Sequence, residues 1–330
     1  MEITHPVSPA SSNAGLVDVD PSGLWCESGG FHIDPWGQVK QALITHGHAD
    51  RARPGSRLYL CAAPCEPVLR ERFGADVTIE SLPYGEVRRI GEVAVSFHPA
   101  GHMLGSAQIR IEHQGEVWVV SGDYKLAPDP TCTPFEPVHC HTFVTEATFG
   151  LPIFRWADQG VVIASINDWW RANQERGRSS LLFAHPLGEA QRVLAALDRG
   201  IGPIQCHEAV ERMNRLYRAG GVDLPESQTP ADMRRALVIA PPSAKRSGIV
   251  STGLVSGWMR IRGTRRHRSI DRGFVISSHA DWPEINRAIE ESGAERVLVS
   301  HGHRAPLVRW LQEHGKAAAA LETRFEGDAE

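Results

Sequence analysis

The sequence predicts an α/β protein with enough strands for two sheets. Short apolar runs bounded by glycine, proline or polar turns fill the first half of the chain, and strands alternate with helical patterns in the second half. Hydrophobic residues make up 42% of the chain and charged residues 22%, which supports a packed core and excludes a disordered, collagen-like or coiled-coil chain. At 330 residues the chain exceeds one average domain, so we expect one large domain or two interleaved domains.

The first half is predicted to be rich in strands. The apolar runs that we interpret as strands cover residues 42–45, 94–97, 108–112, 117–121 and 142–145. They are short and partly alternate between apolar and polar side chains, as half-buried strands do. The sequence His-Gln-Gly-Glu at 113–116 separates two of these runs and predicts a hairpin turn.

The second half is predicted to alternate strands and helices. A strand at 180–184 precedes a helix at 188–199, and a strand at 235–240 ends at two prolines. We expect a strand at 274–277, then a helix that Asp281 caps, with an early proline, and that Gly293 closes. A strand at 296–300 and a helix at 306–315 follow, and the alanine run at 317–320 is expected to lie in a frayed end.

Composition also limits where the protein acts. No run of eighteen apolar residues is present, and the first twenty residues lack the basic start and apolar stretch of a signal peptide. The six cysteines include no Cys-x-x-Cys pair, which favours free thiols over a disulfide framework. We therefore expect a cytoplasmic protein without a membrane partner.

Charge is distributed unevenly along the chain. The whole sequence has a formal net charge of −4, yet residues 234–272 contain ten basic residues and one acidic residue, a net charge of +9. Such a segment is typical of a surface that faces a long polyanion. A solvated surface loop explains the charge equally well, and charge alone leaves both interpretations open.

Several histidines and carboxylates follow apolar runs, where a strand end would hold them rigidly. His46-Gly47-His48-Ala49-Asp50 comes directly after one run, and its two imidazoles could converge on one metal while the carboxylate reaches a neighbouring position. The other candidates in this position are His102, Asp123, Glu146, His279 and His301. The carboxyl ends of strands in α/β sheets meet at the crevice where such proteins place their sites. The pattern therefore predicts metal chemistry.

These motifs resemble a known family. HGHAD at 46–50, GHMLGSA at 101–107, SGDYK at 121–125, TEATFG at 145–150, SSHADW at 277–282 and VSHG at 299–302 occur in the order of the metallo-β-lactamase-fold nucleases with a β-CASP insertion. FHIDPW, ARPGS, EATFGLPIFRW and SGWMRIRG resemble more narrowly the bacterial ligase-associated DNA exonucleases. The resemblance implies an αββα sandwich formed by residues 1–150 and 275–330, with an α/β β-CASP domain inserted at 151–274.

The resemblance also implies roles for individual residues. His46, His48 and His102 match the ligands of a first divalent metal, zinc or manganese, and Asp123 matches the carboxylate that bridges to a second. Asp50 and His301 match ligands of the second metal. Asp34 matches a buried carboxylate that holds the His46–Asp50 loop by hydrogen bonds. His279 matches a histidine near the scissile phosphate, with Glu146 as the acid that orients it.

Physical chemistry agrees with these roles. A histidine has a pKa near working pH and suits the general acid that protonates a leaving oxygen, and a carboxylate beside it favours the imidazolium form. We therefore assign the general acid to His279 with Glu146 as its partner, and Asp50 is a candidate acceptor of the nucleophile's proton. The basic residues expected to grip substrate phosphates are Lys245, Arg246, Arg260, Arg262, Arg265 and Arg266.

One position departs from the family pattern. The family motif is His-x-His-x-Asp-His, and here Arg51 follows Asp50. Arginine is always charged and cannot donate a lone pair to a metal, so the second site should be weakened. Either one metal binds tightly and a second is recruited with substrate, or Arg51 replaces the second metal electrostatically by facing the phosphate. In a further alternative, Arg51 turns outward and a neighbouring residue completes the site.

The leading function is a metal-dependent DNA exonuclease acting in repair on single- or double-stranded ends, with a DNA ligase and other repair proteins as partners implied by the resemblance. An RNA-processing nuclease is the nearest alternative, since related nucleases act on both polymers. A nuclease-dead nucleic-acid-binding subunit would require lost ligands, whereas five of the six expected ligands have suitable chemistry. The basic segment disfavours a small-molecule lactamase or thioesterase.

Overall fold

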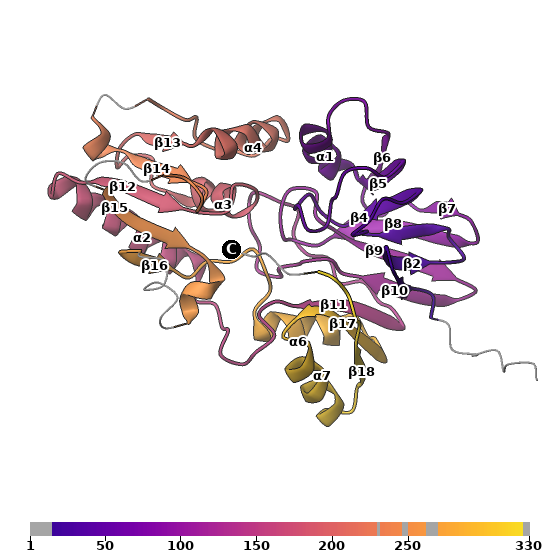
Figure 1. Ribbon diagram of the computed structural model, residues 1–330. Helices are drawn as coiled ribbons and strands as arrows, with labels where there is room; N and C mark the ends of the chain where they lie inside the picture. Colours follow the sequence, from indigo (N-terminus) through magenta and orange to yellow (C-terminus); the bar gives the residue numbers. More distant parts are fainter. Residues whose placement is uncertain (1–14, 230–231, 246–249, 262–269, 326–330) are drawn as a thin grey trace, which may run out of the picture.

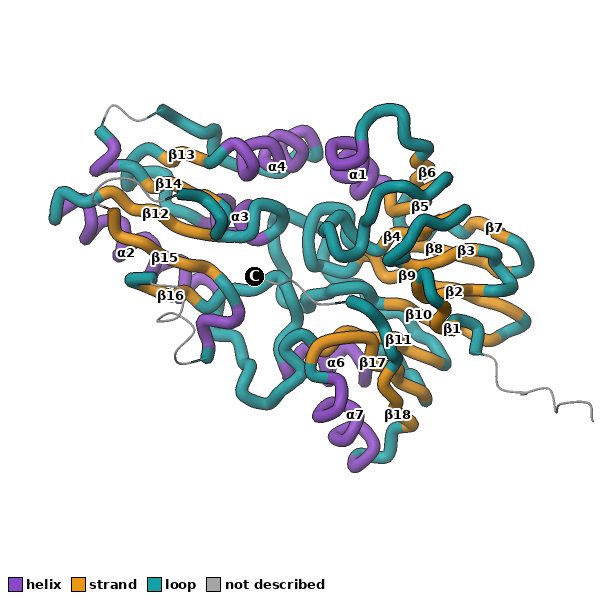
Figure 2. The backbone as a smooth tube through the Cα atoms, viewed as in Figure 1, coloured by secondary structure: helices purple, strands orange, loops and turns teal. Residues whose placement is uncertain are grey.

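The computed structural model describes residues 15–229, 232–245, 250–261 and 270–325, and its strands form three sheets. Two of the sheets lie on one side of the molecule and the third lies on the other (Figure 1). Long loops connect the two sides, as Figure 2 shows.

The first sheet contains six strands in sequence order. They are β1 (Asp18–Asp20), β2 (Gly23–Cys26), β3 (Phe31–Ile33), β4 (Gln41–Ile44), β5 (Leu58–Ala62) and β6 (Ile79–Leu82). The sheet is antiparallel from β1 to β3 and parallel from β3 to β6. A 3-10 turn, η1 (Ala63–Cys65), and helix α1 (Glu66–Phe73) connect β5 to β6. A parallel pair needs a crossover of this kind.

The second sheet contains seven strands in the order β18-β17-β11-β10-β9-β8-β7. Their bounds are β7 (Arg88–Ile90), β8 (Val93–Pro99), β9 (Ala107–His113), β10 (Glu116–Val120), β11 (Thr142–Ala147), β17 (Arg296–Gly302) and β18 (Ala317–Ala320). Helices α6 (Trp282–Glu291) and α7 (Arg304–Glu313) belong to the same half. Strands far apart in sequence, β11 and β17, pair in parallel next to the edge strand β18.

Alternating side chains bind these layers together. In β4, Leu43 packs into the core between the two sheets, whereas Ala42 and Ile44 face the opposite core with Leu69 of α1. In the second sheet, Val299 packs with the residues of α6 and α7 on its outer face. This period of two buries both faces of each sheet. The result is the αββα layering that the motifs predict.

The third sheet is fully parallel, with strand order β13-β14-β12-β15-β16. Its strands are β12 (Ser179–Phe183), β13 (Ile204–Cys206), β14 (Leu237–Ala240), β15 (Val250–Val255) and β16 (Arg272–Phe274). Its helices are α2 (Gln159–Glu175), α3 (Glu189–Ala196) and α4 (Glu208–Ala219), with short 3-10 turns η2 (Met233–Arg235) and η3 (Gly257–Arg260). All these elements lie inside the predicted insertion; the domain boundaries at 150/151 and 274/275 stay a prediction.

Three predicted elements are wrong. The strand expected at 274–277 ends at Phe274, because β16 pairs with β15 only as far as Val255, so His279 lies on a loop rather than at a strand end. The strand expected at 235–240 begins at Leu237, since residues 233–235 form a 3-10 turn. The alanine run expected to fray is strand β18, which pairs in parallel with β17.

The described part of the chain contains no helix with both the length and the apolar character needed to cross a lipid bilayer.

Candidate metal centre

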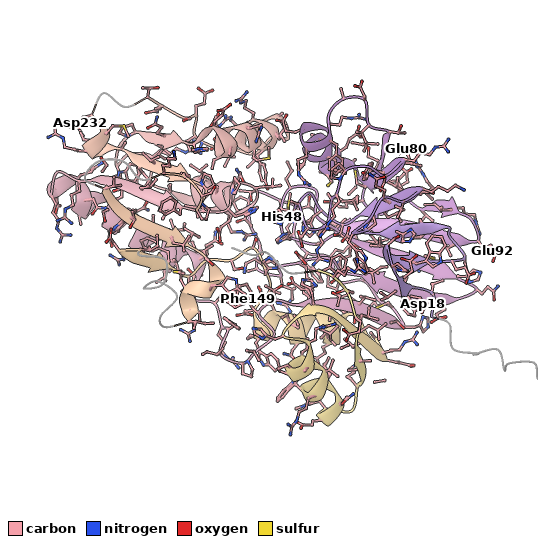
Figure 3. All side chains as sticks on the ribbon, in the orientation of Figure 1. Asp18, His48, Glu80, Glu92, Phe149 and Asp232 are labelled. Carbon is pink, nitrogen blue, oxygen red and sulfur yellow. The ribbon has the colours of Figure 1, made fainter. Side chains whose placement is uncertain are left out.

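The first cluster of candidate ligands gathers where strands of the first and second sheets end. His46 and His48 follow β4, His102 follows β8 and Asp123 follows β10. All four side chains are buried, with exposed fractions of 0–3%. Figure 3 places His48 between the third sheet and the first two sheets. Strand ends fix these residues because the backbone before each one is held by ladder hydrogen bonds.

The four side chains turn ligand atoms toward a common point. One ligand atom from each lies within 4.8 Å of the others. The distance is 3.4 Å from His46 Nε2 to Asp123 Oδ2 and 3.2 Å from His102 Nε2 to His48 Nδ1. In a tetrahedron with metal–ligand bonds of about 2.0 Å, neighbouring ligand atoms are about 3.3 Å apart. The spacing therefore fits one tetrahedral cation.

Hydrogen bonds on the outer side of the rings fix which nitrogen faces the centre. His48 Nε2 donates to the carbonyl of Leu187 (3.0 Å), and His102 Nδ1 donates to the carbonyl of Ser278 (2.9 Å). His46 Nε2 and Asp123 Oδ2, two acceptors that face each other, have no hydrogen-bond partner although both are buried. Buried acceptors without donors are costly, and a cation between them satisfies both. The four ligand atoms of this cluster therefore fit a divalent metal.

Asp34 holds the His46–Asp50 loop, as predicted from the sequence. It accepts hydrogen bonds from the backbone N–H of Thr45 (2.8 Å) and from the Thr45 hydroxyl (2.6 Å). The same hydroxyl lies 3.1 Å from His46 Nδ1, which connects the carboxylate to the imidazole of His46. Burial raises the pKa of Asp34 to about 7, although Arg51 and the Thr45 hydrogen bonds act against that rise.

Arg51 points inward and its guanidinium contacts the ligands expected for a second metal. Arg51 Nη2 lies 2.6 Å from Asp123 Oδ1 and 2.8 Å from His301 Nε2, and Arg51 Nε lies 3.2 Å from Asp50 Oδ2. The outward orientation, one of the alternatives above, is wrong for this structure. His301 and Asp123 also group with Glu146 within 4.8 Å, while Asp50 belongs to neither of the two groups found among the described residues.

The buried charges perturb one another. Burial acts to lower the pKa of Arg51, but the carboxylates of Asp123, Asp50 and Asp34 outweigh it and the net shift is upward. Burial acts to raise the pKa of Asp123, but Arg51, His46 and His301 together outweigh it and hold that pKa well below its usual value. Burial also lowers the pKa of His46, which keeps this ring neutral and able to bind a metal.

His279 and Glu146 form the predicted pair. His279 Nδ1 lies 2.9 Å from Glu146 Oε2, and both side chains are buried. Glu146 is itself fixed by the backbone N–H of Tyr124 (3.0 Å) and the hydroxyl of Thr148 (2.5 Å). The His279 ring centroid is 4.7 Å from that of His102, so the pair borders the candidate metal centre.

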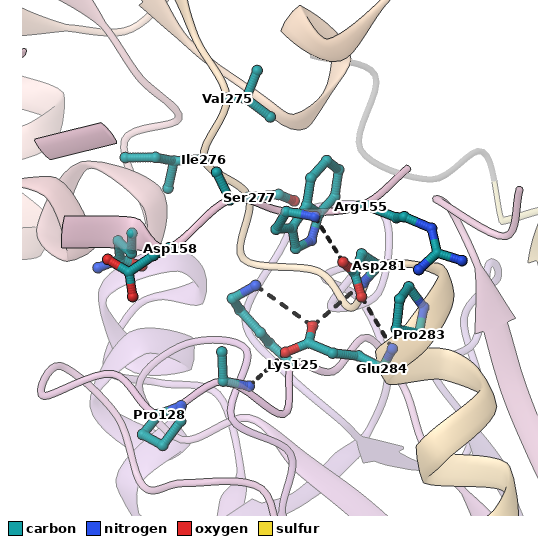
Figure 4. Close-up of a pocket in the computed structure, with 14 residues that line it drawn as sticks. Lys125, Pro128, Arg155, Asp158, Val275, Ile276, Ser277, Asp281, Pro283 and Glu284 are labelled. Carbon is teal, nitrogen blue, oxygen red and sulfur yellow. Dashed lines mark hydrogen bonds and ion pairs between the residues drawn. The ribbon is translucent and has the colours of Figure 1, made fainter. Parts of the chain in front are cut away.

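The loop that carries His279 is anchored by a polar network beside a pocket of about 530 Å³. Trp156 Nε1 donates to the carbonyl of His279 (3.0 Å), and the backbone N–H of Trp156 donates to Asp281 (2.7 Å). Figure 4 shows Lys125, Asp281 and Glu284 at the centre of this network, with Lys125 Nζ 3.6 Å from Glu284. These contacts replace the strand that the sequence predicted and hold His279 in place.

The predicted phosphate-binding residues are only partly described. Arg246, Arg262, Arg265 and Arg266 lie outside the described residues. Arg260 is exposed, and its Nε donates to the carbonyl of Ile153 (3.2 Å). Lys245 is exposed beside a hollow that Ser179 and His207 also line and that Arg260 does not.

Sequence reasoning missed three contributors to the centre. The carbonyl of Leu187, from the third-sheet region, orients His48 and carries no side-chain signal. Arg192 on α3 is buried, lies 3.1 Å from Asp129 and approaches the carbonyl of His102 (3.5 Å). Phe325 packs its ring against the Arg51 guanidinium, 4.0 Å from Cζ to the ring centroid. An arginine inside an apolar helical face was the one available signal, at Arg192.

Comparisons with known proteins agree with the fold and the motifs. A protein of Opitutus terrae named probable DNA ligase is 28% identical over 91% of this chain and 30% of its own length. Endoribonuclease YSH1 of Gibberella zeae is 30% identical over 36% of this chain and 14% of its own length, and a ribonuclease of Thermus thermophilus is 28% identical over 36% and 34%. The chain therefore spans about a third or less of these relatives. No protein-family model matches it.

Among solved structures, a protein of unknown function from Enterococcus faecalis superposes with a TM-score of 0.57 at 12% identity, over 87% of this chain and 80% of its own. That likeness concerns the fold alone. The ordered motifs, the αββα layers and the named relatives together support a metallo-β-lactamase-fold nuclease of the β-CASP type.

Proposed function

We propose that this chain is a metal-dependent exonuclease that hydrolyses phosphodiester bonds of DNA in repair. The observation that carries the proposal is the convergence of four buried ligand atoms beside the His279–Glu146 pair. A cation site next to an oriented imidazole supplies both requirements of the reaction, charge neutralisation and proton transfer.

His46, His48, His102 and Asp123 would hold the ion. Three imidazoles and one carboxylate suit zinc, and manganese is the alternative that accepts the same donors. When bound, a divalent ion acidifies water and neutralises charge on the attacked phosphoryl group. We propose one tightly held ion at this position.

In the proposed reaction, side chains of the protein orient the general acid and protonate the leaving oxygen. Glu146 accepts a hydrogen bond from His279 Nδ1 and thereby fixes the tautomer and favours the charged ring. His279 then protonates the leaving oxygen from its other ring nitrogen. Asp50 is the further candidate for accepting a proton; both of its carboxylate oxygens are buried, and it is ion-paired to Arg51.

The extent of the alignments supports DNA over RNA as the substrate. The relative that aligns with 91% of this chain is named a probable DNA ligase, whereas each ribonuclease described above aligns with 36%. That alignment occupies 30% of the ligase-named protein, which supports a DNA ligase as a partner of this chain. The ribonuclease relatives keep an RNA-processing activity as the second candidate.

We further propose that residues 151–274 form an inserted domain that grips nucleic-acid backbone. Exposed Arg260 and Lys245 are the described members of its basic set. Phosphate contacts of this kind bind without reading bases.

The decisive experiment digests matched DNA and RNA oligonucleotides, single- and double-stranded and labelled at either end, across a panel of divalent metals. The proposal expects metal-dependent release of nucleotides from DNA ends that His46→Ala abolishes. Preferential cleavage of RNA would favour the second candidate, and cleavage that persists in His46→Ala would contradict the site.

A further inference from the structure

Arg51 is a buried cation in a pocket of ligands. Its side chain is 2% exposed, and its guanidinium contacts Asp50, Asp123 and His301. Only 3.2 Å separates His301 Nε2 from Asp123 Oδ1, a spacing suited to two ligands of one ion. Arg51 Nη2 is within hydrogen-bond distance of both atoms.

The guanidinium and an ion exclude each other at this position. An ion bound to both atoms would lie about 2.0–2.2 Å from each of them. Arg51 Nη2, at 2.6 and 2.8 Å from the same two atoms, already fills that space. Arginine supplies positive charge and donors but no lone pair, so it neutralises the carboxylates without coordinating an ion.

The C-terminal part of the described chain holds the guanidinium in this position. Phe325, 8% exposed, places its ring 4.0 Å from Arg51 Cζ and 6.0 Å from the His301 ring. The segment before it is fixed to β17, since the backbone N–H of Leu321 donates to the carbonyl of Val299 (2.9 Å). A cation–π contact on one side and ion pairs on the other fix the side chain.

Asp123 divides its two oxygens between the two positions. Oδ1 faces Arg51 at 2.6 Å, and Oδ2 faces His46 at 3.4 Å and has no hydrogen-bond donor. We propose that Arg51 is a built-in replacement for the second ion, so that the chain holds one ion and Asp123 connects this ion to the guanidinium. The inference rests on the proposed function for the first ion and deepens it, because it predicts a mononuclear centre.

The test counts ions. The parent protein, Arg51→His and the control Arg57→His are stripped with chelator, reloaded with Mn²⁺ or Zn²⁺, dialysed and measured by elemental analysis. Arg57 is an exposed arginine in the same segment, so its variant controls for an added imidazole. We expect Arg51→His to hold one more ion per chain than the parent, and Arg57→His to match the parent.

A spectroscopic readout locates the extra ion. Two Mn²⁺ ions that share Asp123 give an exchange-coupled electron paramagnetic resonance spectrum, whereas a single ion gives an uncoupled one. We expect coupling in Arg51→His and none in the parent. Equal ion counts in Arg51→His and the parent, or two coupled ions in the parent, would overturn the inference.

The outcomes separate this inference from the proposed function. The inference concerns the difference of one ion between Arg51→His and the parent, whereas the proposed function requires the ion of the parent and its loss in His46→Ala. If Arg51→His does not fold, titration of the parent alone still decides, since binding of two ions to the parent contradicts a guanidinium that fills the second position.

Discussion

The two halves of the candidate centre share Asp123 but offer a cation very different surroundings. On the histidine side, His46 Nε2 and Asp123 Oδ2 are buried acceptors without a donor. On the arginine side, Asp123 Oδ1 and His301 already contact Arg51. Neighbouring positions at one edge of the same layers can therefore be completed in two ways, by a bound ion or by a side chain of the protein.

The largest expected effect comes from removing a ligand on the histidine side. His46→Ala takes away an imidazole that faces the centre, and the ion should be lost together with all nuclease activity. His301→Ala, on the arginine side, should retain the ion, because the four ligands of the histidine side remain. Elemental analysis and a nuclease assay measure both. If the two variants lose the ion equally, the halves are not distinct.

His279→Ala should lower turnover strongly and leave the ion in place. His279 borders the histidine side but is assigned to proton transfer, which contributes on the order of 10²–10⁴-fold. Single-turnover kinetics and elemental analysis of the same preparation check this. His314→Ala, at an exposed histidine, is the control and should behave as the parent. Loss of the ion from His279→Ala would make this residue a ligand and the assignment wrong.

Arg192→Ala should destabilise the fold and weaken the histidine side. The substitution leaves the buried Asp129 carboxylate without its partner, which costs about 3–5 kcal/mol of unfolding free energy. Arg171→Ala breaks an exposed ion pair with Asp198 and should cost about 0–1 kcal/mol. Denaturant unfolding compares them. A similar small loss in both variants would show that Arg192 does not support the His102 loop.

The smallest expected effect lies in the predicted basic surface. Replacing Arg260, Arg262, Arg265 and Arg266 by Gln should weaken DNA binding and flatten its salt dependence by roughly 0.9 in log–log slope for each phosphate that the protein no longer neutralises. Replacing exposed Arg287 and Arg309 by Gln gives a variant with charges removed from α6 and α7 instead. The affinity for DNA, measured at several salt concentrations, distinguishes the two variants. If the salt dependence of DNA binding has the same slope in both variants, the basic segment is better explained as a solvated surface loop.

The grouping of the side chains on the histidine side could be predicted from the sequence for a physical reason. Its ligands follow apolar strands, and strand ends of α/β layers meet at one edge, so short local patterns suffice to bring His46, His48 and His102 together. The αββα layers are predictable on the same basis, because the short apolar run of β4 is buried on both faces, as expected of a strand between two layers. The hairpin at 113–116 also forms as predicted, with Gln114 and Gly115 at positive φ.

The arginine side depends on contacts that local patterns do not encode. Whether Arg51 points inward is decided by His301, 250 residues away, and by Phe325, near the end of the described chain. The His279 loop was predicted as a strand end because Val275 and Ile276 are apolar, yet β16 has no partner beyond Phe274. Strand β18 was missed since four alanines carry little strand propensity and pair only because β17 is adjacent.

The hydrogen bond from His48 to the carbonyl of Leu187 makes ion binding and the docking of the third sheet one thermodynamic cycle. A motion that separates the third sheet from the first two sheets breaks this hydrogen bond. His48, a proposed ligand, then loses the contact that orients its ring, and the affinity for the ion falls. Coupling of this kind is reciprocal, and a bound ion therefore opposes the separation by the same free energy. Affinity for an ion and the docking of the third sheet would therefore report on a single equilibrium.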